Sequence, residues 1–114
     1  TDGTEQRQFL YAEDCCEALE TVMNCYSDFK PTDPLHITSF NATSIAEIAS
    51  HIQGYFNGIR KYDVKIKPGF AKDSVQMDKR NEADTYITGW WLPKTGIDQG
   101  IAKVFEEMKK DYGY

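Results

Sequence analysis

The chain has 114 residues, a net charge of −5 and a hydrophobic content of 40%, with six Phe, seven Tyr and two Trp. This length and composition fit a single folded domain, residues 1–114, and argue against a disordered tail. The acidic balance, without any basic run, argues against nucleic acid as a partner.

The chain carries no sign of a membrane segment or of a metal site. No hydrophobic run approaches the roughly 20 residues of a spanning helix, and no signal peptide is visible, so we expect a cytoplasmic protein. Cys15, Cys16 and Cys25 are odd in number and lack C-x-x-C spacing. We therefore expect buried free thiols, with neither zinc nor disulfides.

The first predicted elements are a strand and a helix. The apolar run Gln8–Tyr11 indicates a short strand. Apolar residues then recur at intervals of three and four over Cys15–Tyr26, which predicts a helix. Glu13 and Asp14 open this helix, where carboxylates complement the positive end of the helix dipole. The prolines of the segment 31–34 end it in a loop.

A second strand and a second helix follow. Leu35–Thr38 is the next strand candidate. Ser44 and Glu47 have the spacing of a capping box, in which serine and glutamate satisfy the backbone of the first helical turn. Behind them an isoleucine-rich stripe over Ile45–Phe56 predicts an amphipathic helix, with Gly58 as its stop.

The last third predicts one more strand and two helices. Tyr62–Lys67 alternates apolar and polar residues, which is typical of a strand. Asp78 can cap a short helix over Lys79–Tyr86, and Thr95–Asp98 resembles another capping arrangement before a final helix over Ile97–Met108. The predicted fold class is therefore α/β (mixed α+β), with short strands interleaved with three or four helices.

One pair of residues raises the question of catalysis. Tyr26 and Lys30 form a Y-x-x-x-K pair, the catalytic spacing of short-chain dehydrogenases. That chemistry also needs a glycine-rich turn for a dinucleotide, and the eight glycines contain no G-x-x-G-x-x-G or G-x-G-x-x-G. Lys30 precedes a proline, which disfavours helix. We interpret Tyr26 as the last core aromatic of the first helix and Lys30 as a solvated charge.

Three segments together resemble a known family. The segment Asp2–Asp14 resembles a G-x-x-x-R-x-F-x-Y-x-x-D motif, Leu35–Thr38 with its capped helix resembles a strand–helix unit, and Gly89–Ile101 resembles an L-G-W-x-P-x-T-x-L-E-E-G-L motif. These motifs occur in this order in extended short-chain dehydrogenases that act on nucleotide sugars (the NAD-dependent epimerase/dehydratase family), especially those acting on GDP-sugars.

The resemblance implies a division of labour. These motifs belong to the family's C-terminal substrate-binding portion, whereas the N-terminal Rossmann half binds NAD(P) and carries the catalytic residues. We therefore expect a fragment without catalytic residues or cofactor of its own, inactive alone, that binds a GDP-linked nucleotide sugar in the complete enzyme. The alternative is a free-standing, non-catalytic binding or assembly module with the same fold.

Two residues correspond to family positions that contact substrate. Arg7 matches the family arginine beside the pyrophosphate or sugar, and its planar charged fork suits phosphate oxygens. Asp73 falls near a family acidic residue that accepts hydrogen bonds from base or ribose. We predict both as substrate-binding residues, although Pro68 and Gly69 come four residues earlier than the family's turn.

Several other conspicuous residues are interpreted as structural. We expect Trp90 and Trp91 to pack in the core. His36 lies in a predicted strand and His51 on a helix flank, and neither has ligand spacing. The pair at positions 79–80, Lys and Arg, could add positive potential near Arg7 but is more typical of a solvated turn.

The last expectation concerns association. If the chain is a severed half, Phe9–Tyr11 would offer an unpaired strand edge, and apolar residues near Trp90 and Trp91 would be exposed. We therefore expect a homodimer that buries at least ~1,000 Å² in total.

Overall fold

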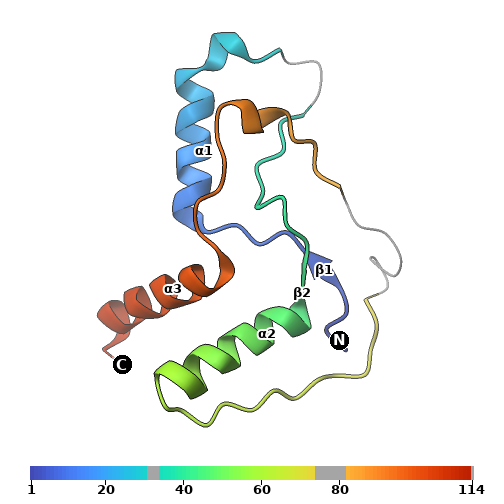
Figure 1. The fold of residues 1–114 in the computed structure, drawn as a ribbon, viewed down its shortest axis with the longest axis vertical. Helices are drawn as coiled ribbons and strands as arrows, with labels where there is room; N and C mark the ends of the chain where they lie inside the picture. Colours follow the sequence, from blue (N-terminus) through green and yellow to red (C-terminus); the bar gives the residue numbers. More distant parts are fainter. Residues whose placement is uncertain (31–33, 74–81, 114) are drawn as a thin grey trace.

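The computed structural model describes residues 1–30, 34–73 and 82–113. Over these residues the fold is mixed α/β, with three α-helices and one two-stranded sheet, which confirms the predicted class. The molecule measures 51 × 38 × 20 Å and is a flat, open plate (Figure 1). Its radius of gyration, 16.9 Å, exceeds the roughly 13 Å of a compact domain of about this length.

The sheet does not involve the predicted strands. β1 (Gln6–Arg7) pairs antiparallel with β2 (Thr43–Ser44). The strands predicted at Gln8–Tyr11, Leu35–Thr38 and Tyr62–Lys67 are wrong, because none of these segments is in a ladder. Their apolar side chains pack between helices and loops. Alternation of apolar and polar residues in the sequence does not distinguish such a packed loop from a strand.

Side-chain amides replace strand pairing at Val64. The Val64 N–H donates to the Asn57 Oδ1 atom (2.7 Å), and the Val64 carbonyl accepts from Asn57 Nδ2 (3.1 Å) and from Gln53 Nε2 (2.9 Å). A buried or half-buried backbone group needs a partner, and here the second helix supplies it without a neighbouring strand. The segment therefore follows the helix as an extended loop.

The first helix forms where its spacing predicts. α1 (Ala12–Asn24) has Glu13 and Asp14 in its first turn and is followed by a 3₁₀ turn, Tyr26–Asp28. Tyr26 is 79% exposed, so its interpretation as a core aromatic is wrong. α1 ends at Asn24 and a 3₁₀ turn follows. Tyr26 therefore no longer continues the buried face of the helix.

The capping box before the second helix is confirmed. α2 (Ile45–Gly54) begins after Ser44, whose hydroxyl accepts from the Glu47 N–H (3.1 Å) while the Glu47 carboxylate accepts from the Ser44 N–H (2.7 Å). The hydrogen bond from the Ser44 N–H to the Glu47 carboxylate, and then a second one that the Ser44 hydroxyl donates to the same carboxylate (2.9 Å), lower the pKa of Glu47. The helix continues as a π-helical turn, Tyr55–Ile59, so Gly58 is not its stop.

In the last part of the chain the final helix forms as predicted, but the segment before it differs from the prediction. The predicted cap Asp78 and residues 79–81 of the predicted helix, including the pair at 79–80, lie outside the described residues, whereas a 3₁₀ turn covers Tyr86–Gly89. α3 (Ile97–Tyr112) confirms the final helix. Its N-cap, Gly96, receives no side-chain hydrogen bond, so the predicted capping arrangement does not form.

A small core joins α1 to the last loop. Ala18, Ile87 and Trp91 are buried, and partly buried apolar side chains surround them: Leu10, Val22, Phe29, Ile37 and Phe40. Core packing is thus confirmed for Trp91. Trp90 remains 37% exposed and packs on Phe29 with ring centroids 4.8 Å apart.

Asp14 fixes the position of the chain that leads into α3. It is only 3% exposed, and its carboxylate accepts hydrogen bonds from the backbone N–H groups of Lys94 (3.1 Å) and Thr95 (2.8 Å) and from the Thr95 hydroxyl (3.1 Å). A buried carboxylate is stable only with such donors. This residue therefore ties the start of α1 to the start of α3.

Candidate functional site

The two residues predicted to bind substrate lie against one another. The Arg7 Nη2 atom donates to the Asp73 Oδ2 atom over 2.6 Å, although the residues are 66 positions apart. The Arg7 side chain is 43% exposed and that of Asp73 is 17% exposed. The structure thus brings together, at one accessible point, a permanent cation and a carboxylate.

Local backbone pairing brings these residues together. Arg7 lies in β1, whose chain begins at Thr1 beside the segment that precedes Asp73. The Gly69 N–H donates to the Thr1 carbonyl (2.9 Å), and the Asp2 N–H donates to the Ala71 carbonyl (2.7 Å). A Cβ atom on Gly69 would lie 2.6 Å from the Thr1 carbonyl oxygen, so glycine is required for this approach.

Neighbouring residues of β1 add hydrogen-bond acceptors. The Glu5 Oε2 and Gln6 Oε1 atoms are buried and meet no donor among the residues that the structure describes. The Glu5 Oε1 atom accepts from the Thr1 hydroxyl, and Arg7 Nη1 donates to the Gln6 carbonyl (2.9 Å). Buried acceptors without a partner are rare in folded proteins, and nothing in the sequence pattern marked these two.

The arrangement suits a ligand with both anionic and donor groups. A guanidinium binds phosphate oxygens through its planar fork, and a neighbouring carboxylate keeps that fork oriented. The carboxylate itself accepts hydrogen bonds from hydroxyl or amide donors. Arg7 and Asp73 therefore lie at one place in the structure, and their role as substrate contacts stays a prediction.

An apolar cleft lies away from this pair of residues. An apolar cleft of about 850 Å³ runs between the segment Phe9–Tyr11, α2, the loop at Tyr62 and α3. Apolar and aromatic side chains form most of its wall: Phe9, Leu10, Ile48, Ile52, Phe56, Val64, Ile97, Ile101, Val104, Phe105 and Met108. Neither Arg7 nor Asp73 lines it, so the cleft offers no cationic fork for a phosphate.

The Y-x-x-x-K pair does not share a helix. Tyr26 lies in the 3₁₀ turn, whereas Lys30 lies after the turn has ended. The backbone N–H of Lys30 donates to the Tyr86 hydroxyl (3.4 Å). A lysine can lower the pKa of a tyrosine one turn away only where a continuous helix holds both side chains on the same face. The geometry favours the interpretation that the pair is not catalytic.

Histidines and cysteines have ordinary surroundings. His36 Nδ1 accepts from the Asp84 N–H (2.7 Å), in an extended loop and not in the predicted strand, and His51 Nδ1 lies 2.8 Å from Asp98 Oδ1. The cysteines are unpaired, but Cys16 is exposed and the other two are half-buried, so the expectation of buried thiols is wrong. Within the described residues, no group of three or more candidate ligands is arranged for a metal ion.

The helices were compared with the length and hydropathy that a membrane-spanning helix needs. In the described part of the chain, no helix is both long and apolar enough to cross a membrane.

Comparison with known proteins supports one relation. A scan against models of protein families found no match, and no solved structure matches the chain. Among curated proteins, the GDP-L-fucose synthase of Sinorhizobium fredii (strain NBRC 101917 / NGR234) is 32% identical over 109 residues, which is 93% of this chain and 32% of that protein. The chain thus spans about a third of the length of the curated relative that it matches. The chain is similar to one region of a GDP-L-fucose synthase, and this similarity supports a relation to that family.

Proposed function

We propose that this chain is the substrate-binding portion of an NAD(P)-dependent nucleotide-sugar epimerase or reductase, and that its ligand is a GDP-linked sugar. The observation that carries the proposal is the 2.6 Å contact between Arg7 and Asp73. The sequence motifs indicate both residues as substrate contacts, and the two come from distant parts of the chain. The similarity to a region of GDP-L-fucose synthase supports the same ligand class.

In this proposal Arg7 binds the diphosphate. Its guanidinium keeps its charge at any physiological pH and offers several donors in one plane. Asp73 holds the guanidinium in place and accepts hydrogen bonds from ribose or base. Two buried acceptors that meet no donor within the described residues, Glu5 Oε2 and Gln6 Oε1, precede Arg7 in the chain.

The chemistry of the parent enzyme requires a second part. No glycine fingerprint for a dinucleotide occurs in these 114 residues, and such a fingerprint is how a Rossmann unit receives a pyrophosphate. We propose that a Rossmann half supplies NAD(P) and the catalytic groups, and that this chain alone is inactive. The role of the chain is then to bind and orient the sugar nucleotide.

Calorimetric titration with GDP-L-fucose tests the proposal. We expect weak but measurable binding, with a dissociation constant of about 1 mM or tighter, equivalent to roughly 4 kcal/mol. Arg7→Ala and Asp73→Asn should each weaken binding at least about tenfold, because each removes a charge-assisted contact. Lys65→Ala is the matched control, since it removes an exposed cation (77% exposed side chain) that pairs with Asp63.

A free-standing binding or assembly module remains the second candidate. The apolar cleft favours it, because a groove of this size can bind a partner without any nucleotide. If GDP-L-fucose does not bind, or if Lys65→Ala weakens binding as much as Arg7→Ala, the nucleotide-sugar proposal is wrong and this candidate replaces it.

A further inference from the structure

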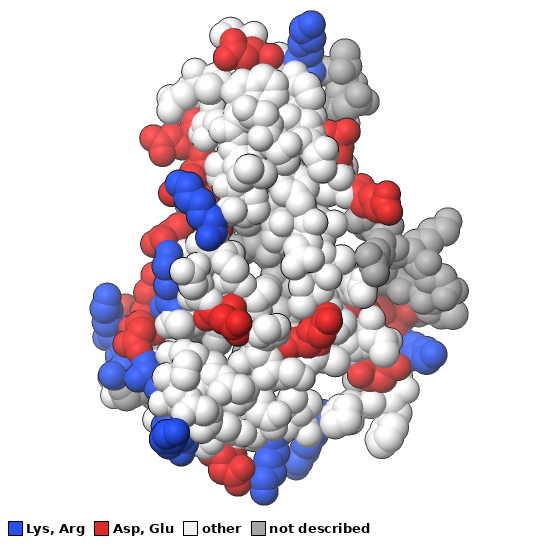
Figure 2. Space-filling model, viewed as in Figure 1, with Lys and Arg blue, Asp and Glu red and all other residues white. Residues whose placement is uncertain are grey.

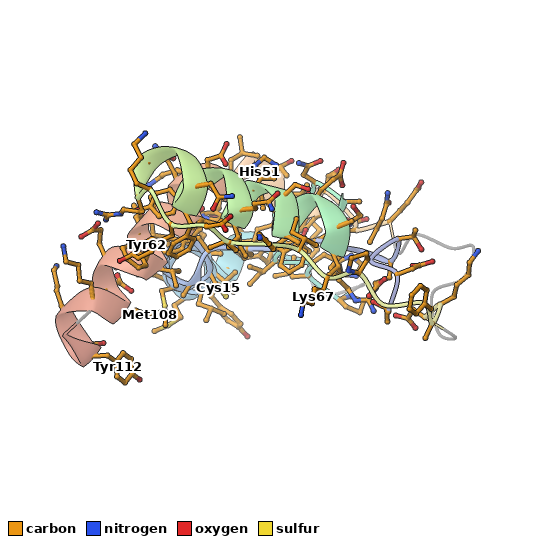
Figure 3. All side chains as sticks on the ribbon, turned by 90° about the horizontal axis from the view of Figure 1, so that it is seen from below. Cys15, His51, Tyr62, Lys67, Met108 and Tyr112 are labelled. Atoms are coloured by element: carbon orange, nitrogen blue, oxygen red, sulfur yellow. The ribbon has the colours of Figure 1, made fainter. Side chains whose placement is uncertain are left out.

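The connecting segment, residues 61–73, runs from the end of α2 to Asp73. It follows α2 from Tyr62 to Lys67 (Figure 3) and then continues toward the N-terminus (Figure 1). Val64 and Asp73 are partly buried, whereas the other residues of the segment are exposed. Charged side chains line the lower edge of the molecule, where this segment runs (Figure 2). The segment therefore depends mainly on hydrogen bonds for its position.

A tight turn directs the connecting segment back along α2. Lys61 has a φ of 63°, in the left-handed region that disfavours residues with a side chain. The Tyr62 N–H donates to the Phe56 carbonyl (2.9 Å), and this hydrogen bond closes the turn. Val64 therefore returns to Asn57, which lies seven positions earlier in the chain.

Asn57 takes the place of a neighbouring strand at Val64. Its side chain accepts from the Val64 N–H (2.7 Å) and donates to the Val64 carbonyl (3.1 Å). A strand residue exchanges the same two kinds of hydrogen bond with its partner in a ladder. Asn57 is partly buried and lies in the π-helical turn Tyr55–Ile59, and such turns are frequent at functional sites.

The far end of the connecting segment is bonded to the start of the chain. Backbone hydrogen bonds with Thr1 and Asp2 hold residues 69–71, and Asp73 follows directly. The segment is thus held at Val64 and at 69–71, with exposed residues between these two places. A stretch with few buried contacts and an exposed backbone is expected to open as one cooperative unit.

We infer that Asn57 is a positioning residue for the Arg7–Asp73 site and acts through the connecting segment that it binds at Val64. Without this contact the start of the segment is released, and the whole unit, Asp73 included, separates from Arg7 more often. The inference deepens the proposed function and rests on it, because a ligand responds to the position of Asp73 only if the site binds that ligand. The effect on the segment itself is measurable without any ligand.

Amide hydrogen exchange of the ligand-free chain is the first test. We expect Asn57→Ala to speed exchange of the Gly69 N–H about tenfold, because the variant leaves the Val64 N–H without its acceptor and the segment opens as a unit. The Ala18 N–H in the core of α1 should keep its rate, which separates this effect from a loss of global stability. Asn24→Ala, at an exposed asparagine that ends α1, is the matched control.

A conservative variant keeps the test decisive if the alanine variant does not fold. Asn57→Gln retains both amide groups one methylene further from the backbone, so it should give a Gly69 exchange rate between those of the parent chain and the alanine variant. Gly69 exchange that neither variant changes overturns the inference. So does Ala18 exchange that rises as much as Gly69 exchange.

Calorimetric titration with GDP-L-fucose is the second test. Asn57→Ala should weaken binding at least about threefold, because Asp73 is in place for a smaller fraction of the time, whereas Asn24→Ala should leave binding unchanged. If the parent chain does not bind GDP-L-fucose, the proposed function fails, and the exchange rates still report whether Asn57 positions the segment. A chain that binds with the same affinity in Asn57→Ala contradicts the inference alone.

Discussion

The Arg7 side chain finds Asp73 because the backbone around both residues is held in place. Hydrogen bonds between the first two residues and the segment 69–71 set the distance between β1 and Asp73. Gly69 is central to this contact, since a side chain there would collide with the Thr1 carbonyl. The candidate site thus depends on a residue that has no chemistry of its own.

Replacing Gly69 should affect both stability and binding. We expect Gly69→Ala to cost about 1–3 kcal/mol, because the added methyl group displaces the N-terminal segment, and to weaken GDP-L-fucose binding together with the Arg7–Asp73 contact. Gly89→Ala is the control, since a Cβ at Gly89 meets open space. Thermal unfolding and calorimetry measure the two effects. Equal behaviour of the two variants would contradict the role of Gly69.

Asp14 has a comparable structural role at the start of α1. It satisfies two backbone N–H groups and one hydroxyl in a buried position. Leaving such donors without an acceptor costs about 1–3 kcal/mol for each group. We therefore expect Asp14→Ala to lower the free energy of unfolding by roughly 3 kcal/mol or more.

Asp14→Asn is the informative comparison. Its amide oxygen still accepts from the backbone, and its amide nitrogen can donate to the Thr95 hydroxyl, so it should retain about half of the lost stability. Chemical denaturation of the three proteins checks this order. An alanine variant as stable as the asparagine variant would show that these hydrogen bonds contribute little.

At the level of elements, the sequence predicted helices well and strands poorly. Helical spacing placed α1, α2 and α3, and the Ser44–Glu47 box placed the start of α2. Each of these signals is local. A strand depends on a partner elsewhere in the chain, and within the described residues Tyr62–Lys67 pairs with no strand. The backbone of Val64 is bound by side-chain amides instead.

The candidate site was predictable only in part, for the same reason. A resemblance indicated Arg7 and Asp73 as separate positions, but their contact depends on how two loops pair. The unsatisfied acceptors of Glu5 and Gln6 depend on burial, which no local pattern specified. The α2–α3 cleft also went unpredicted, because it needs the placement of two helices relative to one another.

The capping box gives α2 a dependence on pH. Hydrogen bonds from Ser44 lower the pKa of Glu47 below its ordinary value of 4.5. A lowered pKa in the folded state means that the contribution is complete above that value and is lost as the pH falls through the lowered pKa. The helix should therefore lose stability in the acid range.

Ser44→Ala tests this dependence. We expect a loss of about 1 kcal/mol near neutral pH, as for other N-cap serines. The difference from the parent chain should shrink below pH 4.5, where Glu47 takes up a proton. Ser50→Ala, in the middle of α2, should show no such pH dependence, because the Ser50 hydroxyl donates to the Ala46 carbonyl, which does not titrate. A constant difference at every pH would contradict this role of the capping box.

At the scale of the whole molecule, the described chain has an open shape and a small core. Three hydrophobic residues are buried in the described chain, and the radius of gyration is that of a spread-out fold. Such a chain is expected to have modest stability alone and to gain stability from any partner that binds only its folded state.

The proposal assigns cofactor binding to a separate Rossmann half, and this assignment predicts how the chain behaves with NADPH. The chain should bind NADPH no better than it binds unrelated nucleotides, because it lacks a glycine turn that receives a pyrophosphate. Calorimetry with NADPH, with GDP-L-fucose as the positive comparison, measures this. Micromolar binding of NADPH would overturn the proposed assignment of cofactor binding to another part.

The central claim is that Arg7 and Asp73 hold a nucleotide sugar, and backbone chemical shifts of the isotopically labelled chain test it most directly. Titration with GDP-L-fucose should shift resonances of β1 and of the segment 69–73, and Arg7→Ala should abolish these shifts. Residues that line the α2–α3 cleft should not respond at sub-saturating ligand. Shifts confined to the cleft, or shifts around β1 that persist in Arg7→Ala, would contradict the claim.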